Sequence, residues 1–182
     1  MNVIEDILPI NFHEGRKGAF PVDCIVIHVT EGDFRSVRSW FRDPASEVSA
    51  HYMVTKTGDV YHFVHENDSA WGNGRVDHPT AQLVLERPGS NPNDWTISIE
   101  HEGNGKEELT APQRQASLEL IRDIQTRHYR ITFDRKHIVG HHEIYSLKTC
   151  PGAISVDRIV NELNHQEDFS DVTGGHSSKG PL

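Results

Sequence analysis

Short runs that alternate apolar and polar residues predict four strand-forming segments along the chain. Residues 22–30, with the sequence VDCIVIHVT, are rich in β-branched residues and bounded by a proline and a glycine, which is typical of a buried strand. Residues 50–64 are predicted as a hairpin with its turn near residues 56–59, which include a glycine. Residues 95–103 return to alternation, and residues 137–140 are predicted as a short strand.

Helical periodicity follows residues whose side chains can cap a helix. Three helix starts are predicted in this way, at Asp33, Thr110 and Ser155. In the first helix, Val37, Trp40 and Phe41 fall at the spacing of one helical face. In the second, Gln113 follows the capping threonine by three residues, which is the spacing of a capping box.

These elements predict a single α/β domain with a central mixed β-sheet flanked by helices. Strands and helices alternate irregularly and one connection is a hairpin, which argues against a doubly wound parallel sheet. The domain is expected to span residues 21–165, after a leader of residues 1–20 that packs on the body or extends from it. Residues 166–182 contain few apolar residues, and disorder is expected there. Between them, residues 66–94 are rich in Asn, Gly, Pro and Asp and are expected to form a long, functional loop region.

Composition and charge exclude several classes of protein. The chain of 182 residues carries a net charge of −9, whereas a nucleic-acid-binding domain normally presents a basic face. No apolar run approaches the ~20 residues of a membrane span. The N-terminal residues include acids where a signal peptide has bases, so we expect synthesis in the cytoplasm without a signal peptide. With two cysteines and a reducing compartment, no disulfide framework is expected.

Polar residues that can do chemistry stand where a strand or its exit would normally be apolar. They are His28, Glu100, the pair His141 and His142, and Cys150. Two imidazoles and a thiolate can bind zinc and leave a fourth position for water. The same residues also permit a second interpretation, a cysteine nucleophile at Cys150 with His141 or His142 as its base. A third interpretation is that these histidines are structural, as isolated histidines at strand ends usually are.

Four sequence patterns, in order, make the chain resemble the zinc-dependent N-acetylmuramoyl-L-alanine amidases of the type-2 group. The patterns are CIVIHVT, SAHYMVTKTGDVYHFV, TISIEHEG and IVGHHEIYSLKTCPG, and the resemblance covers residues 22–163. It implies a Zn²⁺ site at one edge of a groove, with His28, His141 and Cys150 as ligands. It also implies that Glu100 is the acid/base and that Lys148 lies near the oxyanion.

The resemblance has two departures. Many members carry W-H-x-G after the hairpin, whereas this chain has Trp71-Gly72-Asn73-Gly74 and lacks that histidine. Some endolysins of the group have a tyrosine before the hairpin histidine, where this chain has Ala50. Both absences place the catalytic role on Glu100. We expect substrate contacts from Trp71, Asn73 and His51.

The implied activity is hydrolysis of the amide between N-acetylmuramic acid and L-alanine in peptidoglycan. The cysteine in K-T-C-P-G favours a phage-type lytic enzyme acting on the cell wall, since recycling amidases of the group usually have K-T-D-P-G. A monomer is expected, with peptidoglycan as partner and neither nucleic acid nor membrane. The alternatives are a non-catalytic peptidoglycan-binding module, a cytoplasmic muropeptide-recycling amidase and a cysteine hydrolase.

Overall fold

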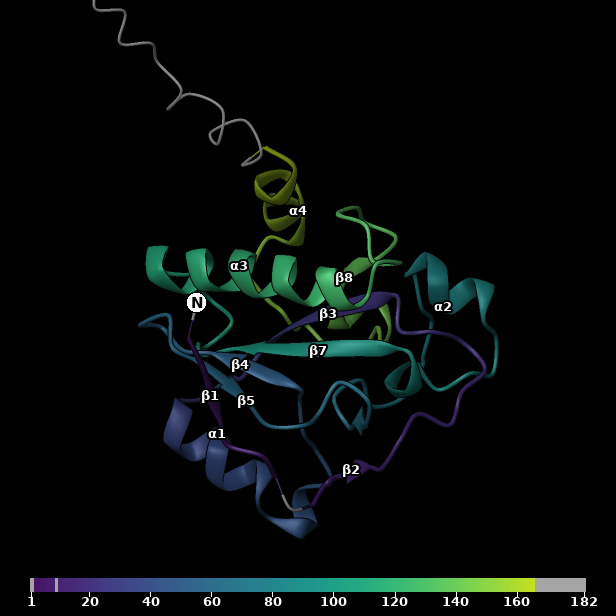
Figure 1. Cartoon of the computed structure of the whole chain (residues 1–182), viewed down its shortest axis with the longest axis horizontal. Helices are drawn as coiled ribbons and strands as arrows, with labels where there is room; N and C mark the ends of the chain where they lie inside the picture. Colours follow the sequence, from purple (N-terminus) through teal and green to yellow (C-terminus); the bar gives the residue numbers. More distant parts are fainter. Residues whose placement is uncertain (1, 9, 166–182) are drawn as a thin grey trace, which may run out of the picture.

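A six-stranded mixed sheet forms the centre of the molecule in the computed structural model, which describes residues 2–8 and 10–165 (Figure 1). Across the sheet the strand order is β1-β5-β4-β7-β3-β8. The hairpin β4–β5 is antiparallel, and the other neighbouring pairs are parallel. In chain order the six strands are β1 (Val3–Glu5), β3 (Cys24–Val29), β4 (Tyr52–Val54), β5 (Val60–His62), β7 (Thr96–His101) and β8 (Ile138–Gly140). The predicted mixed sheet in a single domain is confirmed.

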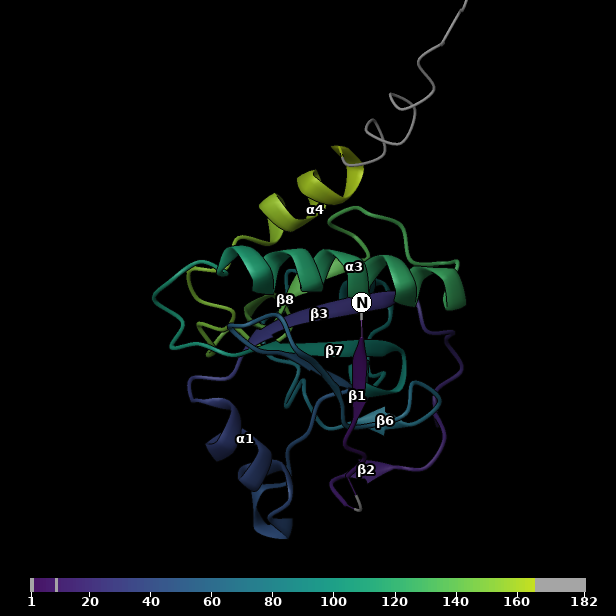
Figure 2. The same cartoon turned by 60° about the vertical axis from the view of Figure 1, so that its left-hand side comes forward.

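Helices cover both faces of this sheet, as Figures 1 and 2 show from two directions. The long helix α3 (Ala111–Arg127) and α4 (Val156–His165) lie on one side, and α1 (Phe34–Phe41) lies on the other. The remaining short elements are η1 (Pro44–Ser46), α2 (Gln82–Glu86), η2 (Pro92–Asp94), η3 (His141–Glu143) and a separate two-stranded sheet of β2 (Phe12–His13) with β6 (Ser69–Ala70).

The three predicted helix caps are present. The side chain of Asp33 accepts hydrogen bonds from two main-chain N–H groups of α1, and those of Thr110 and Ser155 accept one each from α3 and α4. The predicted capping box is only half formed. The Gln113 side chain donates instead to the main-chain oxygens of Val54 and Glu102, each at 3.0 Å, because these buried acceptors lie at the ends of β4 and β7.

Strand β3 is buried along its whole length and divides the core into two layers. Its Ile25, Ile27 and Val29 pack toward α3 and α4 in the largest apolar cluster. Its Cys24 and Val26 belong to a separate cluster that includes α2. Because side chains alternate along a strand, His28 points to the same face as these two residues and away from the largest cluster.

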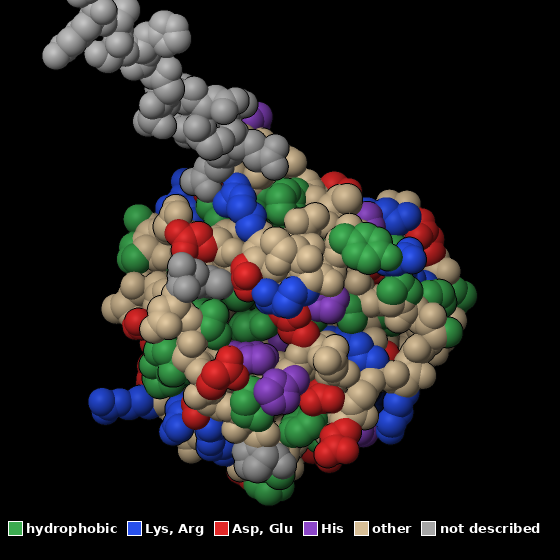
Figure 3. All heavy atoms as spheres, in the orientation of Figure 1, with side chains coloured by type: hydrophobic (Ala, Val, Ile, Leu, Met, Phe, Trp, Pro, Cys, Tyr) green, Lys and Arg blue, Asp and Glu red, His purple; other side chains and the backbone are tan. Residues whose placement is uncertain are grey.

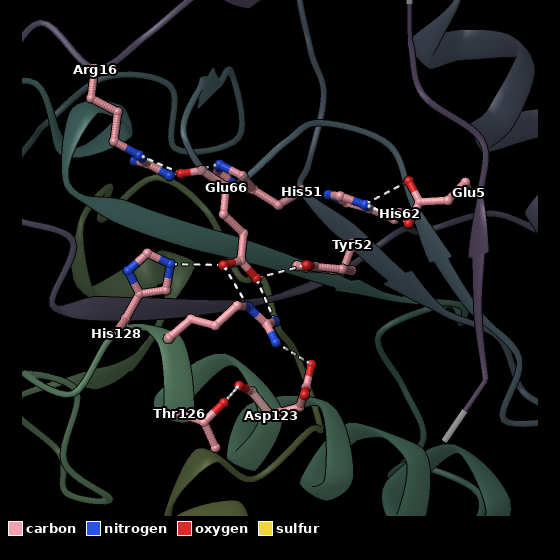
Figure 4. Close-up of polar contacts among 10 residues, drawn as sticks. Glu5, Arg16, His51, Tyr52, His62, Glu66, Asp123, Thr126 and His128 are labelled. Carbon is pink, nitrogen blue, oxygen red and sulfur yellow. Dashed lines mark hydrogen bonds and ion pairs between the residues drawn. The ribbon is translucent and has the colours of Figure 1, made fainter.

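The predicted leader is built into the fold. Residues 3–5 form the edge strand β1, parallel to β5, and residues 12–13 pair with β6. The guanidinium of Arg16 donates to the main-chain oxygen of Glu66 at 2.8 Å (Figure 4). It also donates to the main-chain oxygens of Asn93 and Thr96 at 3.1 and 3.0 Å, which ties this segment to the long loop region. The tail predicted over residues 166–182 lies outside the described residues.

Acidic and basic side chains lie interspersed on the face of the molecule that Figure 3 presents. Within the described residues, helix length and hydropathy give no candidate for a membrane-spanning helix.

Candidate metal centre and its cleft

The three predicted metal ligands meet at one edge of the sheet. His28 lies near the carboxyl end of β3, and His141 follows directly after the neighbouring parallel strand β8. Cys150 returns to the same edge at the end of the following loop. One ligand atom from each residue lies within 4.8 Å of the others, and all three residues are buried. The parallel register creates this meeting, since carboxyl ends of parallel strands lie side by side.

Close packing within the segment from Gly140 to Gly152 brings the cysteine beside the histidine. A Cβ on Gly140 would lie 2.8 Å from Cδ of Pro151, so this position admits no side chain. His142 donates from its main-chain N–H and its ring Nδ1 to the Cys150 carbonyl, at 2.8 and 3.0 Å. Gly152 has a positive φ of 66°, and a Cβ there would overlap the Gly105 backbone.

Burial sets the protonation states of the two histidines. Burial, followed by the charges of nearby histidines, lowers the pKa of His28 well below its usual value. Burial also lowers the pKa of His141, to about 4. Both rings are therefore neutral near pH 7, which is the form in which imidazole binds a metal.

The thiol of Cys150 is poorly suited to act as a nucleophile. Burial, followed by the negative charge of Glu100, raises its pKa above the usual range. A reactive cysteine needs the opposite, an electropositive and accessible environment. A bound cation would instead stabilise the thiolate, and the main-chain N–H of Val29 already donates to Sγ at 3.2 Å.

The surroundings of the triad fit a metal ion. His141 Nε2 lies 3.1 Å from the main-chain oxygen of Asn73, which accepts a hydrogen bond from this nitrogen. The proton of the ring is therefore on Nε2, and Nδ1 is free to bind a metal ion. The buried His101 donates from Nδ1 to the main-chain oxygen of His28 at 3.0 Å and fixes the end of β3. Two imidazoles and one thiolate are a ligand set that zinc accepts, with a fourth position open.

Glu100 lies opposite His28 in the β3–β7 register, next to the triad. Its Oε2 is enclosed and lacks a hydrogen-bond partner in the part of the chain that the structure describes. Burial, and then the negative charge of Glu31, raises the pKa of Glu100 to about 8. A carboxyl group that exchanges its proton near neutral pH suits general acid/base chemistry, and a cation bound beside it would lower this pKa.

A cleft of about 660 Å³ opens above the triad. Lys148 and Leu147 line it on one side, and Val37 and Trp40 of α1 contribute to its lining as well. Trp40 is 55% exposed, whereas Val37 and Phe41 of the same predicted face are buried. Sequence periodicity predicts that Trp40 packs in the core. In the structure its side chain lines the cleft instead, because Trp40 lies at the border of the buried stripe of α1.

The structure separates the three residues that are expected to contact substrate. Trp71 lines the cleft. His51 is fully buried, and its Nδ1 accepts from the Ser98 N–H at 3.0 Å, so the expected substrate contact of His51 is corrected to a structural role. Asn73 is also fully buried, and its expected substrate contact is corrected in the same way.

Gly72 explains the missing histidine of the W-H-x-G pattern. A Cβ on Gly72 would lie 2.7 Å from Oγ of Ser98 and 3.2 Å from the main-chain oxygen of Ser49. A histidine at this position would require the Ser98 side chain to move and would crowd the Ser49 backbone.

Sequence reasoning missed Trp40, Leu147 and Glu31 as residues of the cleft. Leu147 is 76% exposed in a loop, and Glu31 is a non-glycine residue with a positive φ of 53°. An apolar residue inside the polar loop before the cysteine was the available signal for Leu147. Nothing in the local pattern distinguishes Glu31.

Comparison with known proteins identifies related sequences. A family model described as N-acetylmuramoyl-L-alanine amidase matches residues 18–153. N-acetylmuramoyl-L-alanine amidase A of Achromobacter lyticus is 30% identical over 107 residues, which are 57% of this chain and 51% of that protein. The 1,6-anhydro-N-acetylmuramyl-L-alanine amidase AmpD of Haemophilus influenzae is 33% identical over 97 residues, 53% of this chain and 47% of that protein. The chain thus spans about half the length of these curated relatives.

Solved structures share the fold. A crystal structure of AmpD matches with a TM-score of 0.70 and 22% identity, covering 87% of this chain and 92% of that chain. The catalytic domain of XlyA matches with a TM-score of 0.64 and 20% identity over 90% and 99% of the two chains. AmiD from E. coli, in complex with the substrate anhydro-N-acetylmuramic acid-L-Ala-D-gamma-Glu-L-Lys, matches with a TM-score of 0.66 and 26% identity over 81% and 60%.

Proposed function

Because the chain belongs to the N-acetylmuramoyl-L-alanine amidase family, we propose that it hydrolyses the amide between N-acetylmuramic acid and L-alanine in peptidoglycan. The observation that carries this proposal is the buried set of His28, His141 and Cys150 at the floor of a cleft, with Glu100 beside it. A family domain that kept only the binding of peptidoglycan would have no need of this complete set.

Each residue of the site has a role in the proposed reaction. His28, His141 and Cys150 would hold Zn²⁺, which supplies a Lewis acid that activates water near neutral pH. Glu100 takes a proton from the attacking water and returns it to the leaving amine of L-alanine. Lys148, on the wall of the cleft, offers its ammonium group to the oxyanion that develops on the lactyl carbonyl.

The substrate that we propose is the intact wall, cut by a lytic enzyme of the phage type. The cysteine in the third ligand position supports this choice, since recycling amidases resembling this chain usually have aspartate there. The AmiD complex contains the same muramic acid–L-alanine linkage within an anhydro fragment. Soluble anhydromuropeptides are therefore the second substrate to compare.

Product analysis tests the proposal directly. The purified protein is incubated with intact peptidoglycan and, separately, with soluble anhydromuropeptide, and the products are identified by mass spectrometry. Free stem peptides that begin with L-alanine are expected, lost with a strong chelator and restored by added zinc. Release from the soluble fragment alone would assign the recycling substrate instead of the wall.

Two results would contradict the proposal. Binding to peptidoglycan without cleavage in the presence of zinc would indicate a binding module. Cleavage that is indifferent to chelation and stopped by thiol alkylation would indicate a cysteine hydrolase, against which the burial and raised pKa of Cys150 argue.

A further inference from the structure

Asn73 contacts the metal centre from its buried side, in the turn that follows β6. Its main-chain oxygen accepts the Nε2 proton of His141 at 3.1 Å. Its side-chain Nδ2 donates to Oγ1 of Thr96 at 2.9 Å, and its main-chain N–H donates to Oδ1 of Asn93 at 3.0 Å. Its side-chain Oδ1 remains: this atom is enclosed and lacks a partner at normal hydrogen-bond geometry among the described residues.

The matching unpaired donor is Nε2 of His28. This atom is also enclosed and without a partner at normal geometry in the described part of the chain, whereas Nδ1 of the same ring faces Sγ of Cys150 at 3.8 Å. Burial lowers the pKa of His28, whereas a contact with the Asn73 side chain acts in the opposite direction and raises it. An effect of that sign is produced by an acceptor facing a ring N–H.

These contacts decide which nitrogen of each ring carries its proton. A carbonyl oxygen only accepts, so His141 is protonated on Nε2 and presents an unprotonated Nδ1 to the triad. Oδ1 of Asn73 and Nε2 of His28 are both enclosed and unpaired among the described residues, and a hydrogen bond between them would place the His28 proton on Nε2 in the same way. The reverse orientation of the amide would put Nδ2 against His28 and force the proton onto Nδ1, where it would exclude a metal ion.

We propose that Asn73 is a positioning residue that fixes both histidine ligands, with its side-chain oxygen for His28 and its main-chain oxygen for His141. One asparagine thereby sets the tautomer and orientation of two rings, one from β3 and one from η3. The inference rests on the metal site of the proposed function, although it does not depend on which substrate is cut.

Zinc affinity of three variants tests this role. Asn73→Ala removes the side-chain acceptor and should weaken zinc binding by about 10–100-fold, measured by competition with a chromophoric chelator. Asn73→Asp restores an acceptor, and its carboxylate can accept from the Thr96 hydroxyl as well, so zinc affinity should recover.

Asn11→Gly is the matched control. Asn11 is a buried asparagine with a φ of 63°, and its Nδ2 bonds to groups of residues 41–46. Glycine keeps that backbone conformation, so this variant should lose thermal stability and keep its zinc affinity. If Asn11→Gly and Asn73→Ala lost zinc affinity equally, the loss in Asn73→Ala would come from general destabilisation of the fold. That result would overturn the inference.

Nitrogen-15 NMR of the histidine rings gives a second readout, made on the zinc-free protein without substrate. In the unaltered chain, His28 and His141 should both be protonated on Nε2. In Asn73→Ala only His28 should lose this preference, because the main-chain oxygen that serves His141 remains. A structural disturbance would alter both rings.

The outcomes separate this inference from the proposed activity. Protonation of His28 on Nδ1 in the unaltered chain would overturn the inference, even if Asn73→Ala failed to fold. Unchanged zinc affinity in a folded Asn73→Ala variant would overturn it too. Zinc binding that depends on Asn73, in a protein that releases no stem peptide, would support the inference and contradict the proposed function.

Discussion

The main-chain N–H of Val29 donates a hydrogen bond of 3.2 Å to Sγ of Cys150, across 121 positions of the chain. Val29 follows His28 on β3, so this bond joins the strand of one candidate ligand to the side chain of another. A donor aimed at sulfur stabilises the thiolate, the form that binds a metal.

Replacing Cys150 by serine should therefore remove most of the zinc affinity, since a hydroxyl does not ionise as a thiol does beside zinc. The loss should exceed the ~10–100-fold that outer contacts of a metal site usually contribute. Competition with a chelator measures it. Cys24→Ala is the control: Cys24, on β3, is also buried but lies outside the triad, so this variant should lose about 1 kcal/mol of stability and keep its zinc. Full zinc occupancy in Cys150→Ser would reject the ligand assignment.

The two adjacent histidines should differ sharply. His141→Ala should abolish stoichiometric zinc binding, because the ring of His141 belongs to the triad. His142→Ala should retain zinc, because that ring is exposed and bonds to the Cys150 carbonyl. Metal analysis of the two purified variants decides between them. Zinc lost in His142→Ala and kept in His141→Ala would show that His142, not His141, is the ligand.

Glu100→Gln should keep zinc and lose turnover, since glutamine has the shape of glutamate and cannot exchange the proton. Loss of a general base lowers the rate by about 10²–10⁴-fold. The rate of stem-peptide release from a soluble muropeptide measures it. Glu102→Gln is the matched control, because Glu102 accepts from the main-chain N–H groups of Phe34 and Lys56 and lies outside the cleft. Near-normal turnover in Glu100→Gln would remove Glu100 from the mechanism.

Trp40→Ala should weaken substrate binding more than it changes turnover. Trp40 is exposed on the cleft wall and is not one of the triad residues or Glu100, so we expect its contact to be common to the ground and transition states. An aromatic contact contributes about 0.5–1.5 kcal/mol, so KM should rise by roughly 2–12-fold with kcat nearly unchanged. Tyr129→Ala, which removes an aromatic ring that is 75% exposed outside the cleft, should leave KM unchanged. An equal KM in both variants would exclude Trp40 from substrate binding.

Glu66 should make the fold sensitive to acid. Its carboxylate accepts hydrogen bonds from Tyr52, Arg127 and His128 at 2.7–3.1 Å (Figure 4). Burial by itself would raise the pKa of Glu66, but the hydrogen bonds from His128, Arg127 and Tyr52 outweigh it and hold the pKa below its usual range. A depressed pKa stabilises the fold above the unfolded value of about 4.5, and this stability is lost as the pH falls through the folded pKa.

Denaturant unfolding at several pH values measures this effect. At pH 7, Glu66→Gln should lower the free energy of unfolding by about 3 kcal/mol, the lower end for removing one partner of a buried ion pair. The difference from the unaltered chain should shrink below pH 5. Glu107→Gln, at a side chain that is 67% exposed, should change stability little at any pH. A difference that stays constant with pH would mean that Glu66 does not carry the titration.

The main strands and helices of this protein, and its candidate chemistry, follow from its sequence. The apolar run of β3, the hairpin, the alternation of β7 and the three helix caps are local patterns, and local backbone preferences determine them. His28 and Glu100 also stood out in the sequence as polar residues where a strand or its exit would normally be apolar. The order of the four motifs then indicated which polar residues belong together.

Only the tertiary structure decided how these residues meet. Alternation determines which face a side chain occupies, but it does not determine which strands become neighbours; the parallel pairing of β3 with β7 and β8 does. The same limit explains the corrections. Burial of His51 and Asn73 and exposure of Trp40 depend on segments distant in sequence, among them Arg16 of the predicted leader, whose guanidinium lies 3.0 Å from the His51 ring. Long-range packing, which no local pattern encodes, buries Asn73 and sets its main-chain oxygen 3.1 Å from Nε2 of His141.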